Sequence, residues 1–472
     1  MTPLKRLPNY KLLRPYQVED ISKLLQHNCC ACFNEQRTGK TPIAISVMEV
    51  RQLDKVVIVC PASMIYPWKD AYKFWTGKDA LVCAGTPVKR LKIIDAWEHG
   101  PLIISYGCLK ETARTGGMLN DIIKKKPDAC IADEAHHFKC HTTATAKAMY
   151  KLAANCVYRL ALTGTPATNR PADIFGILHW LYPDEFKSYW EFIYYNFKTS
   201  RQYTGFNKSH IEIGDWQPTR QKAMAEYLSK FTTQRKREEV MPWLPPKDYL
   251  KVRLPATPLQ KKYLAELKEY FETEDLVTQS ILDRMIRERQ ICVSPQIVDL
   301  KGSSPKIDWV LDYLNDYPDK RVIIFSKFKK GIQLLHDALI EKRIKGQVIT
   351  GEVSSKDRAE IVDAFQHGDY RYLILQIDAC KEGLTLDEAD VEIFLDAYPP
   401  AADVQQAEDR FVATTEDKKN KAHQIIQLMI EGTYDEECYN LVERRASSIG
   451  CINSYINYIK TQEVKSNGNS NG

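Results

Sequence analysis

The sequence lacks any uninterrupted apolar run that approaches the roughly 18–20 residues needed to span a bilayer. Residues 1–13 also lack an apolar core long enough for a signal peptide. We therefore expect an intracellular protein with no membrane contact. It would work in the cytoplasm or nucleoid, or in the host cytoplasm if it is viral.

Paired cysteines and a strong charge bias are missing as well. The 13 cysteines include no paired CxxC knots, and several lie in apolar runs, which favours a reducing compartment over a disulfide framework. A zinc site from His136, His137, Cys140 and His141 is an alternative, but their spacing matches no common zinc motif. The net charge of +5 fits a protein that concentrates Lys and Arg in one cleft.

Short apolar runs are present instead, and helix-like stretches separate them. They form two sets, residues 28–33, 55–60, 101–105, 129–132 and 158–163, then residues 321–326, 346–350, 371–376, 391–395 and 422–428. Continuous apolarity suits strands buried on both faces of a parallel sheet. The sequence therefore predicts an α/β protein with two tandem doubly wound parallel-sheet lobes and helical insertions between them.

The expected organisation has five segments. Residues 1–182 form the first lobe, and the aromatic-rich residues 183–245 form a helical insertion and a basic lobe junction. Residues 246–300 are the helical start of the second half, where 257–292 reads as long helices. Residues 301–460 form the second lobe, and the small, polar residues 461–472 form a disordered tail.

A phosphate-binding loop is indicated by NEQRTGKT, which ends in Gly39, Lys40 and Thr41 between an apolar strand and a helix. Such a loop points backbone N–H groups at an anion, aided by the helix dipole. Lys40 would reach the β- and γ-phosphates of ATP, and Thr41 would bind Mg²⁺. Asn34 occupies a position where glycine is common, and Asn tolerates left-handed backbone well.

Two acids follow another apolar strand in IADEAHHFK. Asp133 would hold Mg²⁺, and Glu134 would orient and polarise the attacking water. Phosphoryl transfer depends mainly on positioning and charge neutralisation, which suits this pair. Together with Lys40, these residues predict an ATP-hydrolysing site.

From about residue 13 to 445 the chain resembles superfamily 2 helicase-type ATPases of the Swi/Snf branch, in a compact viral or bacterial form. The motifs that carry the resemblance are LRPYQ (13–17), CPASMIYPWKDAYKFW (60–75), DEAHHFK (133–139), LTGTPATNRPADIFGILHWLYPDEF (162–186), QRKREEVMPWLPPK (234–247), IIFSKF (323–328), EGLTL (382–386) and QAEDR (406–410). Residues 183–245 also resemble their counterpart in fork-remodelling annealing helicases. The alternative is that residues 183–245 form a helical protrusion whose aromatic side chains only fill a small core.

The resemblance implies two RecA-like lobes and an ATP-dependent DNA translocase, acting on duplex, forked or branched DNA in repair or replication. Gln17 would recognise adenine, and Gly383 and Arg410 would complete the ATP site from the second lobe. Thr163, Gly164 and Thr165 would couple the nucleotide to DNA. The implied DNA contacts are Ser63, Trp68, Ser105, Tyr106, Arg235, Arg237, Ser326, Lys327 and Thr385.

Motif VI departs from the family pattern, because Ala413 stands where a second arginine is usual. Arg410 then acts alone, Lys418 or Lys419 substitutes, or hydrolysis is weak. Two alternatives to the translocase stay open: a strand-separating DNA or RNA helicase, and an ATP-gated DNA clamp with little hydrolysis. We expect a monomer with ATP and Mg²⁺ as ligands.

Overall fold

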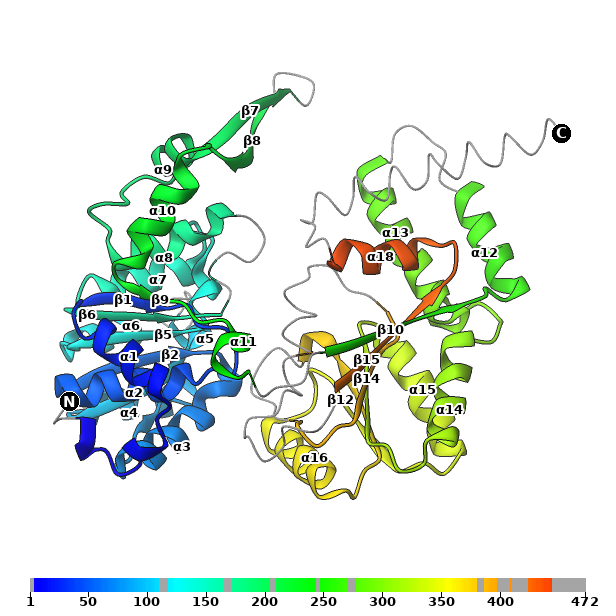
Figure 1. Cartoon of the computed structure of the whole chain (residues 1–472), viewed down its shortest axis with the longest axis horizontal. Helices are drawn as coiled ribbons and strands as arrows, with labels where there is room; N and C mark the ends of the chain where they lie inside the picture. Colours follow the sequence, from blue (N-terminus) through cyan, green and yellow to red (C-terminus); the bar gives the residue numbers. More distant parts are fainter. Residues whose placement is uncertain are drawn as a thin grey trace. The chain divides into compact units, whose positions relative to one another are not determined.

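The computed structural model describes residues 4–109, 118–164, 166, 171–203, 209–242, 247–269, 277–379, 386–396, 408 and 423–443. The chain divides into two compact units, Met1–Pro242 and Trp243–Gly472 (Figure 1). Each unit contains one parallel β-sheet. In the described part of the chain no helix is long and apolar enough to cross a bilayer.

The first unit is built on a seven-stranded sheet in the order β3-β4-β2-β5-β6-β1-β9, and every neighbouring pair is parallel. Its strands are β1 (Cys29–Cys32), β2 (Lys55–Cys60), β3 (Leu81–Val82), β4 (Gly100–Ser105), β5 (Ala129–Asp133), β6 (Tyr158–Leu162) and β9 (Thr232–Thr233).

Helices cover both faces of this sheet, because alternate strand residues point to opposite sides. Val56 and Ile58 of β2 join one buried cluster with α1 (Pro15–Leu24), α2 (Lys40–Arg51) and α3 (Ile65–Thr76). Val57 and Val59 join the other cluster. The helices of that second face are α4 (Pro87–Asp95), α5 (Tyr106–Leu109), α6 (Met118–Lys124), α7 (Ala144–Ala153) and α8 (Phe175–Leu181).

The end of the first unit carries an insertion. Helix α9 (Tyr189–Asn196) buries Phe192 and Ile193 in the second face's cluster. A projecting antiparallel hairpin follows, formed by β7 (Phe197–Tyr203) and β8 (Ser209–Trp216) (Figure 1). Two helices complete the unit, α10 (Arg220–Ser229) and α11 (Arg237–Val240).

The second unit is built on a six-stranded, wholly parallel sheet in the order β10-β15-β14-β11-β13-β12. Its strands are β10 (Lys247–Leu254), β11 (Val322–Ser326), β12 (Gly346–Ile349), β13 (Tyr372–Gln376), β14 (Val391–Phe394) and β15 (His423–Ile430). Its helices are α12 (Pro258–Glu269), α13 (Val277–Val293), α14 (Pro305–Asp316), α15 (Lys329–Glu341), α16 (Ser355–His367) and α18 (Tyr434–Glu443).

The second sheet is also covered on both faces. Val322 and Ile324 of β11 pack with apolar residues of α14 and α15, whereas Ile323 and Phe325 pack with residues of α16 and α18. Seven short 3₁₀ helices complete the described elements: η1 (Leu4–Arg6), η2 (Tyr10–Leu12), η3 (Ala62–Met64), η4 (Ala135–Phe138), η5 (Pro171–Ile174), η6 (Pro295–Val298) and η7 (Ile377–Ala379).

All ten predicted apolar strands are present, and the predicted α/β fold with two parallel sheets is confirmed. Two local predictions were wrong. The insertion expected to be helical contains the β7–β8 hairpin, and the segment after residue 246 begins with strand β10 before helices α12 and α13. The tail at 461–472 lies outside the described residues.

Candidate functional site

Three chemically distinctive segments meet at one edge of the first sheet. Strands β5, β6 and β1 are parallel neighbours, so their carboxyl ends lie side by side. The loop of residues 33–39 follows β1, Asp133 and Glu134 end or follow β5, and Thr163 follows β6. Ligands of open α/β sheets bind at this edge.

The loop turns into α2 through two residues of positive φ, Arg37 at 63° and Gly39 at 78°. A Cβ on Gly39 would collide with Nε2 of Gln17, so glycine is needed there for space as well as for backbone conformation. A Cβ on Gly164 would lie 3.2 Å from the backbone nitrogen of Gln36, so the segment after β6 also approaches the loop closely.

Lys40 is the first residue of α2, and its Nζ lies within the loop. It donates hydrogen bonds to the backbone oxygens of Asn34 at 3.1 Å and Glu35 at 3.2 Å. Thr41 is half-buried beside it. A cation and a helix N-terminus therefore coincide at the end of β1, which is the arrangement that favours an anionic ligand.

Asp133 is a buried carboxylate at the end of β5, only 6% exposed. The Trp68 indole Nε1 donates to its Oδ2 at 2.8 Å, and the Glu134 backbone N–H donates to its Oδ1 at 3.1 Å. Burial, followed by repulsion from Glu134, raises the pKa of Asp133 to about 6. A buried, oriented carboxylate whose charged form is disfavoured by its surroundings is suited to bind a cation, because the cation would stabilise that charged form.

Glu134 begins a chain of polar contacts that leads to β6. Its backbone is left-handed, with φ of 49°, and its Oε2 lies 3.2 Å from Nδ1 of His136. The same Nδ1 lies 3.2 Å from Oγ1 of Thr163, which is fully buried. His136 thus joins the acid to the predicted coupling residue, a link that the sequence did not reveal.

Gln17, on α1, contacts the phosphate loop through its side-chain amide. Its Nε2 donates to the backbone oxygen of Thr38 at 3.2 Å, and its Oε1 accepts from the backbone nitrogen of Arg14 at 2.8 Å. The side chain is buried and packs against Gly39. Its predicted contact with adenine stays a prediction.

Four of the residues predicted to contact DNA have buried side chains, which contradicts that role for those side chains. Trp68 and Tyr106 are buried, and they donate to the carboxylate and to the backbone oxygen of Asp133 instead. Ser105 is buried and donates to Sγ of Cys108. Ser326, in the second unit, is fully buried and donates to Asp396 at 2.7 Å. Side chains packed this way are not accessible to a DNA backbone.

The remaining predicted DNA residues differ in accessibility. The Arg235 guanidinium is paired with Glu19 and Asp20, each at 2.9 Å, so it holds α1 and is not free for phosphate. Ser63, Arg237 and Lys327 are half-buried, and their DNA contacts stay predictions. Thr165, Gly383, Thr385 and Arg410 lie outside the described residues.

Asp20 is the residue of this region that sequence reasoning missed. It is 2% exposed and accepts hydrogen bonds from Asn34 and Arg235. A signal was available, because Asp20 follows Gln17 by three residues and so shares its helix face. An acid on a buried helix face requires a partner.

The zinc alternative finds no support in the described residues, which contain no cluster of three or more His, Cys, Asp or Glu placed to hold a metal. His137 stacks on Tyr106, and His141 stacks on Tyr189. Cys140 is exposed and contacts the Thr142 hydroxyl.

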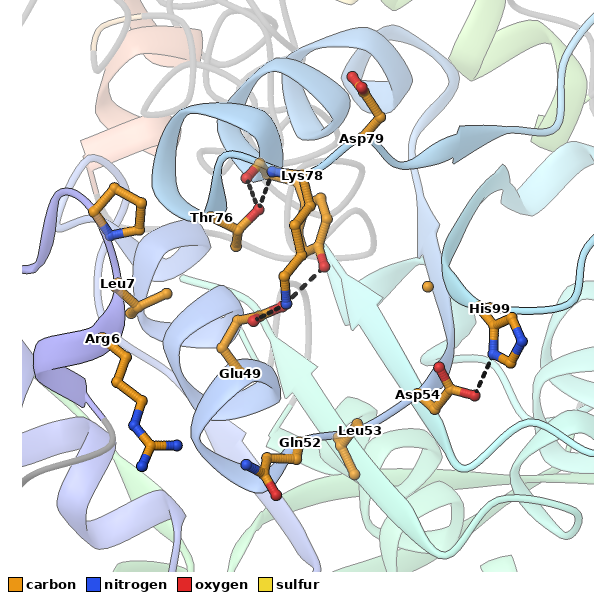
Figure 2. Close-up of a pocket in the computed structure, with 13 residues that line it drawn as sticks. Arg6, Leu7, Glu49, Gln52, Leu53, Asp54, Thr76, Lys78, Asp79 and His99 are labelled. Carbon is orange, nitrogen blue, oxygen red and sulfur yellow. Dashed lines mark hydrogen bonds and ion pairs between the residues drawn. The ribbon is translucent and has the colours of Figure 1, made fainter.

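A cavity of about 680 Å³ lies at the opposite edge of the first sheet, where β2 and β4 begin (Figure 2). Four of its charged groups form two pairs with one another. Glu49 accepts from Lys78 at 2.6 Å and from the Tyr72 hydroxyl at 2.8 Å, and Asp54 pairs with His99 at 2.8 Å. We therefore place the chemistry at the carboxyl edge.

The donor set at the carboxyl edge fits a nucleoside triphosphate with a divalent cation. The loop and Lys40 supply N–H and ammonium donors for phosphate oxygens. The Thr41 hydroxyl and the Asp133 carboxylate are hard oxygen ligands of the kind that Mg²⁺ prefers.

Comparison with known proteins agrees with this chemistry. The SNF2-related domain matches residues 17–297, and the helicase conserved C-terminal domain matches residues 305–412. Human "DNA annealing helicase and endonuclease ZRANB3" is 24% identical over 464 residues, which cover 93% of this chain and 40% of that protein. Human "Chromodomain-helicase-DNA-binding protein 6" is 24% identical over 524 residues, which cover 98% of this chain and 18% of that protein.

Among solved structures, the "Sulfolobus solfataricus SWI2/SNF2 ATPase core in complex with dsDNA" is 22% identical. The match covers 92% of this chain and 91% of that chain, with a TM-score of 0.41. The chain spans less than half the length of the two human relatives.

Proposed function

Because this chain belongs to the SNF2-related family of helicase-like ATPases, we propose that it is a DNA-stimulated ATPase that moves along and remodels DNA. The observation that carries the proposal is the meeting of Lys40, Thr41, Asp133 and Glu134 at one sheet edge. Similarity to proteins whose names describe DNA annealing and DNA binding supports DNA as the substrate.

The first unit would bind the nucleotide. Loop N–H groups and Lys40 would hold the β- and γ-phosphates, and Gln17 would sit near the base. Thr41 and Asp133 would hold Mg²⁺, which supplies charge neutralisation on the phosphate oxygens. Trp68 and the Glu134 N–H orient Asp133, whose pKa of about 6 leaves it ionised at neutral pH.

Glu134 would orient and polarise the attacking water. Its contact with His136, and that of His136 with Thr163, offers a path by which the state of the γ-phosphate could reach the segment after β6. Gly164 and Thr165 belong to that segment, which approaches the phosphate loop closely at Gly164. We assign Thr163, Gly164 and Thr165 to coupling on this basis.

Arg410 would contact the γ-phosphate, and Gly383 would also bind the nucleotide. Ser63 and Arg237 of the first unit, and Lys327 and Thr385 of the second unit, would contact DNA phosphates. Phosphate contacts of this kind position a protein without reading sequence. We propose duplex, forked or branched DNA as substrates, and an intracellular monomer as the working form.

The test is ATP turnover on single-stranded, duplex, forked and four-way DNA, with single-stranded and duplex RNA as controls. A translocase of this branch should be stimulated by duplex-containing DNA and should leave a blunt duplex unseparated. Strand separation of a blunt or RNA duplex would instead support an unwinding helicase. Tight, ATP-dependent DNA binding without turnover would support an ATP-gated clamp, the alternative that Ala413 suggests.

A further inference from the structure

Asn34 opens the phosphate loop and is fully buried. Its Nδ2 donates to Oδ2 of Asp20 at 2.7 Å, and its backbone oxygen accepts from Nζ of Lys40 at 3.1 Å. The orientation of the amide follows from the chemistry, because only the NH₂ group can donate to a carboxylate. Asn34 therefore links α1 directly to the lysine that we assign to the phosphates.

Asp20 is held on its other oxygen by Arg235. The guanidinium Nε lies 3.0 Å from Oδ1, and a terminal nitrogen of the guanidinium lies 2.9 Å from the same oxygen. The second partner of Arg235 is Glu19, at 2.9 Å. A buried carboxylate is costly without partners, so one amide and one guanidinium fix the position of Asp20.

The segment that carries Arg235 also runs along the loop through its backbone. The backbone N–H of Phe33 donates to the oxygen of Thr233 at 2.8 Å, and that of Glu35 donates to the oxygen of Arg235 at 3.0 Å. The N–H of Arg237 donates to the Glu35 carboxylate at 2.8 Å. The first half of the loop is thus fixed by β9 and the residues that follow it.

We propose that the triad Asn34–Asp20–Arg235 is a positioning device that sets the phosphate loop for nucleotide binding. The two carbonyl groups that accept from Lys40 belong to Asn34 and Glu35, so a shift of this half of the loop shifts the ammonium group directly. The glycine that is common at position 34 has no side chain, whereas Asn34 holds the loop through its side-chain hydrogen bond to Asp20. The inference rests on the proposed nucleotide site and assigns three positioning residues to it.

The decisive variant is Asn34→Asp, which keeps the side-chain shape and places a second carboxylate against Asp20. Loss of one charge-assisted hydrogen bond and like-charge repulsion should weaken the binding of a fluorescent ATP analogue on the order of tenfold or more. The exchange variant Asp20→Asn/Asn34→Asp restores one amide and one carboxylate. It should return the dissociation constant to within about threefold of wild type.

Two further variants supply a control and a second test of the positioning role. Asp128→Asn is a matched control. The Asp128 carboxylate accepts hydrogen bonds from the backbone N–H groups of Asp54 and Lys55, at the opposite edge of the sheet from the phosphate loop. It should lower the melting temperature and leave nucleotide affinity unchanged. Arg235→Lys keeps the charge but loses the guanidinium fork, so it should weaken nucleotide binding several-fold, which gives a readout if Asn34→Asp does not fold.

Unchanged affinity of Asn34→Asp in a folded protein would overturn the positioning role, as would an exchange variant that folds but binds no better than Asn34→Asp. A wild-type protein that binds no nucleotide would overturn the proposed function and this inference together. Affinity is measured without turnover, so weak hydrolysis does not affect the outcome.

Discussion

At the scale of single residues, the central feature is a pair of buried carboxylates with different partners. Asp20 is matched by an amide and a guanidinium, whereas Asp133 has a neutral indole donor, a backbone N–H and the carboxylate of Glu134 nearby. The partners of Asp20 are therefore all supplied by the protein itself. Asp133 retains an electrostatic cost that a bound cation would remove.

Replacing Asp133 by Asn should remove an ionisation cost on the order of 1–3 kcal/mol at neutral pH, while one of the two N–H donors to Asp133 loses its acceptor at every pH. The folded pKa of about 6 lies above the unfolded value, so ionisation of Asp133 costs stability. That cost is absent below the unfolded pKa of about 4 and complete above the folded pKa. Urea unfolding between pH 4 and 8 should show a difference between variant and wild type that grows up to about pH 6. A difference independent of pH would contradict this assignment.

Replacing Trp68 by Phe separates its two possible roles. The change removes the hydrogen bond to Asp133, so turnover should fall by about tenfold, the loss typical of a hydrogen bond to a charged group. The acid limb of the pH–rate profile should move upward, because that hydrogen bond lowers the pKa of Asp133. Trp97, also buried and bonded to a backbone oxygen, provides the control Trp97→Phe. A loss of DNA affinity with normal basal turnover would restore the DNA role.

The sequence located Lys40 and Asp133 because Lys40 follows the loop after one buried strand and Asp133 ends another, and the carboxyl ends of parallel strands share one edge. It misplaced Trp68 and Tyr106, because whether an aromatic ring faces the core or the solvent depends on how its helix packs. It could not reveal the triad of Asn34, Asp20 and Arg235, since Arg235 is more than 200 positions from Asn34 in the sequence. Contacts at that separation depend on the complete fold.

At the scale of elements, strands β7 and β10 were not predicted, and their sequences give the reason. β10 is an edge strand with Tyr249 and Leu250 exposed, and its sequence alternates polar and apolar residues. β7 reads FKTSRQY, which is largely polar, and it pairs only with β8. Neither strand has the continuous apolarity that identified the ten predicted strands.

A buried ion pair joins two helices of the second unit. Lys306 of α14 and Asp435 at the start of α18 are fully buried, 2.6 Å apart. Lys306→Met should lower the free energy of unfolding by about 3–5 kcal/mol, because it leaves a buried carboxylate without its cation. Lys306→Met/Asp435→Asn should recover part of that loss, because Asn is neutral and still accepts from the Ile430 backbone N–H.

The matched control for this pair is Lys330→Met, which removes an exposed pair with Asp299. Its effect on the free energy of unfolding should stay below about 1 kcal/mol. Equal effects of the two lysine substitutions in chemical denaturation would contradict the importance given to burial.

At the scale of the whole molecule, the chain contains two units of the same architecture, and family matches extend over both. The first unit carries the loop, the cation and the acids of the proposed ATP site. Arg410, assigned to the second unit, lies outside the described residues, so its role rests on the motif alone.

Arg410→Ala should abolish DNA-stimulated turnover while leaving nucleotide affinity within a few-fold of wild type. An arginine finger stabilises the transition state and can contribute about 10³–10⁵ in rate. Steady-state turnover and equilibrium binding of the same preparation provide the comparison, with Lys418→Ala and Lys419→Ala as controls for a substitute cation. Normal turnover of Arg410→Ala would exclude it as the finger.

The most direct test of the ATPase assignment is ATP turnover of the wild-type protein and of Lys40→Ala, each with and without forked DNA. We predict turnover by the wild type that rises when DNA is added, and turnover by Lys40→Ala at the background level under both conditions. Absence of turnover in the wild type, or equal turnover in the variant, would contradict the account.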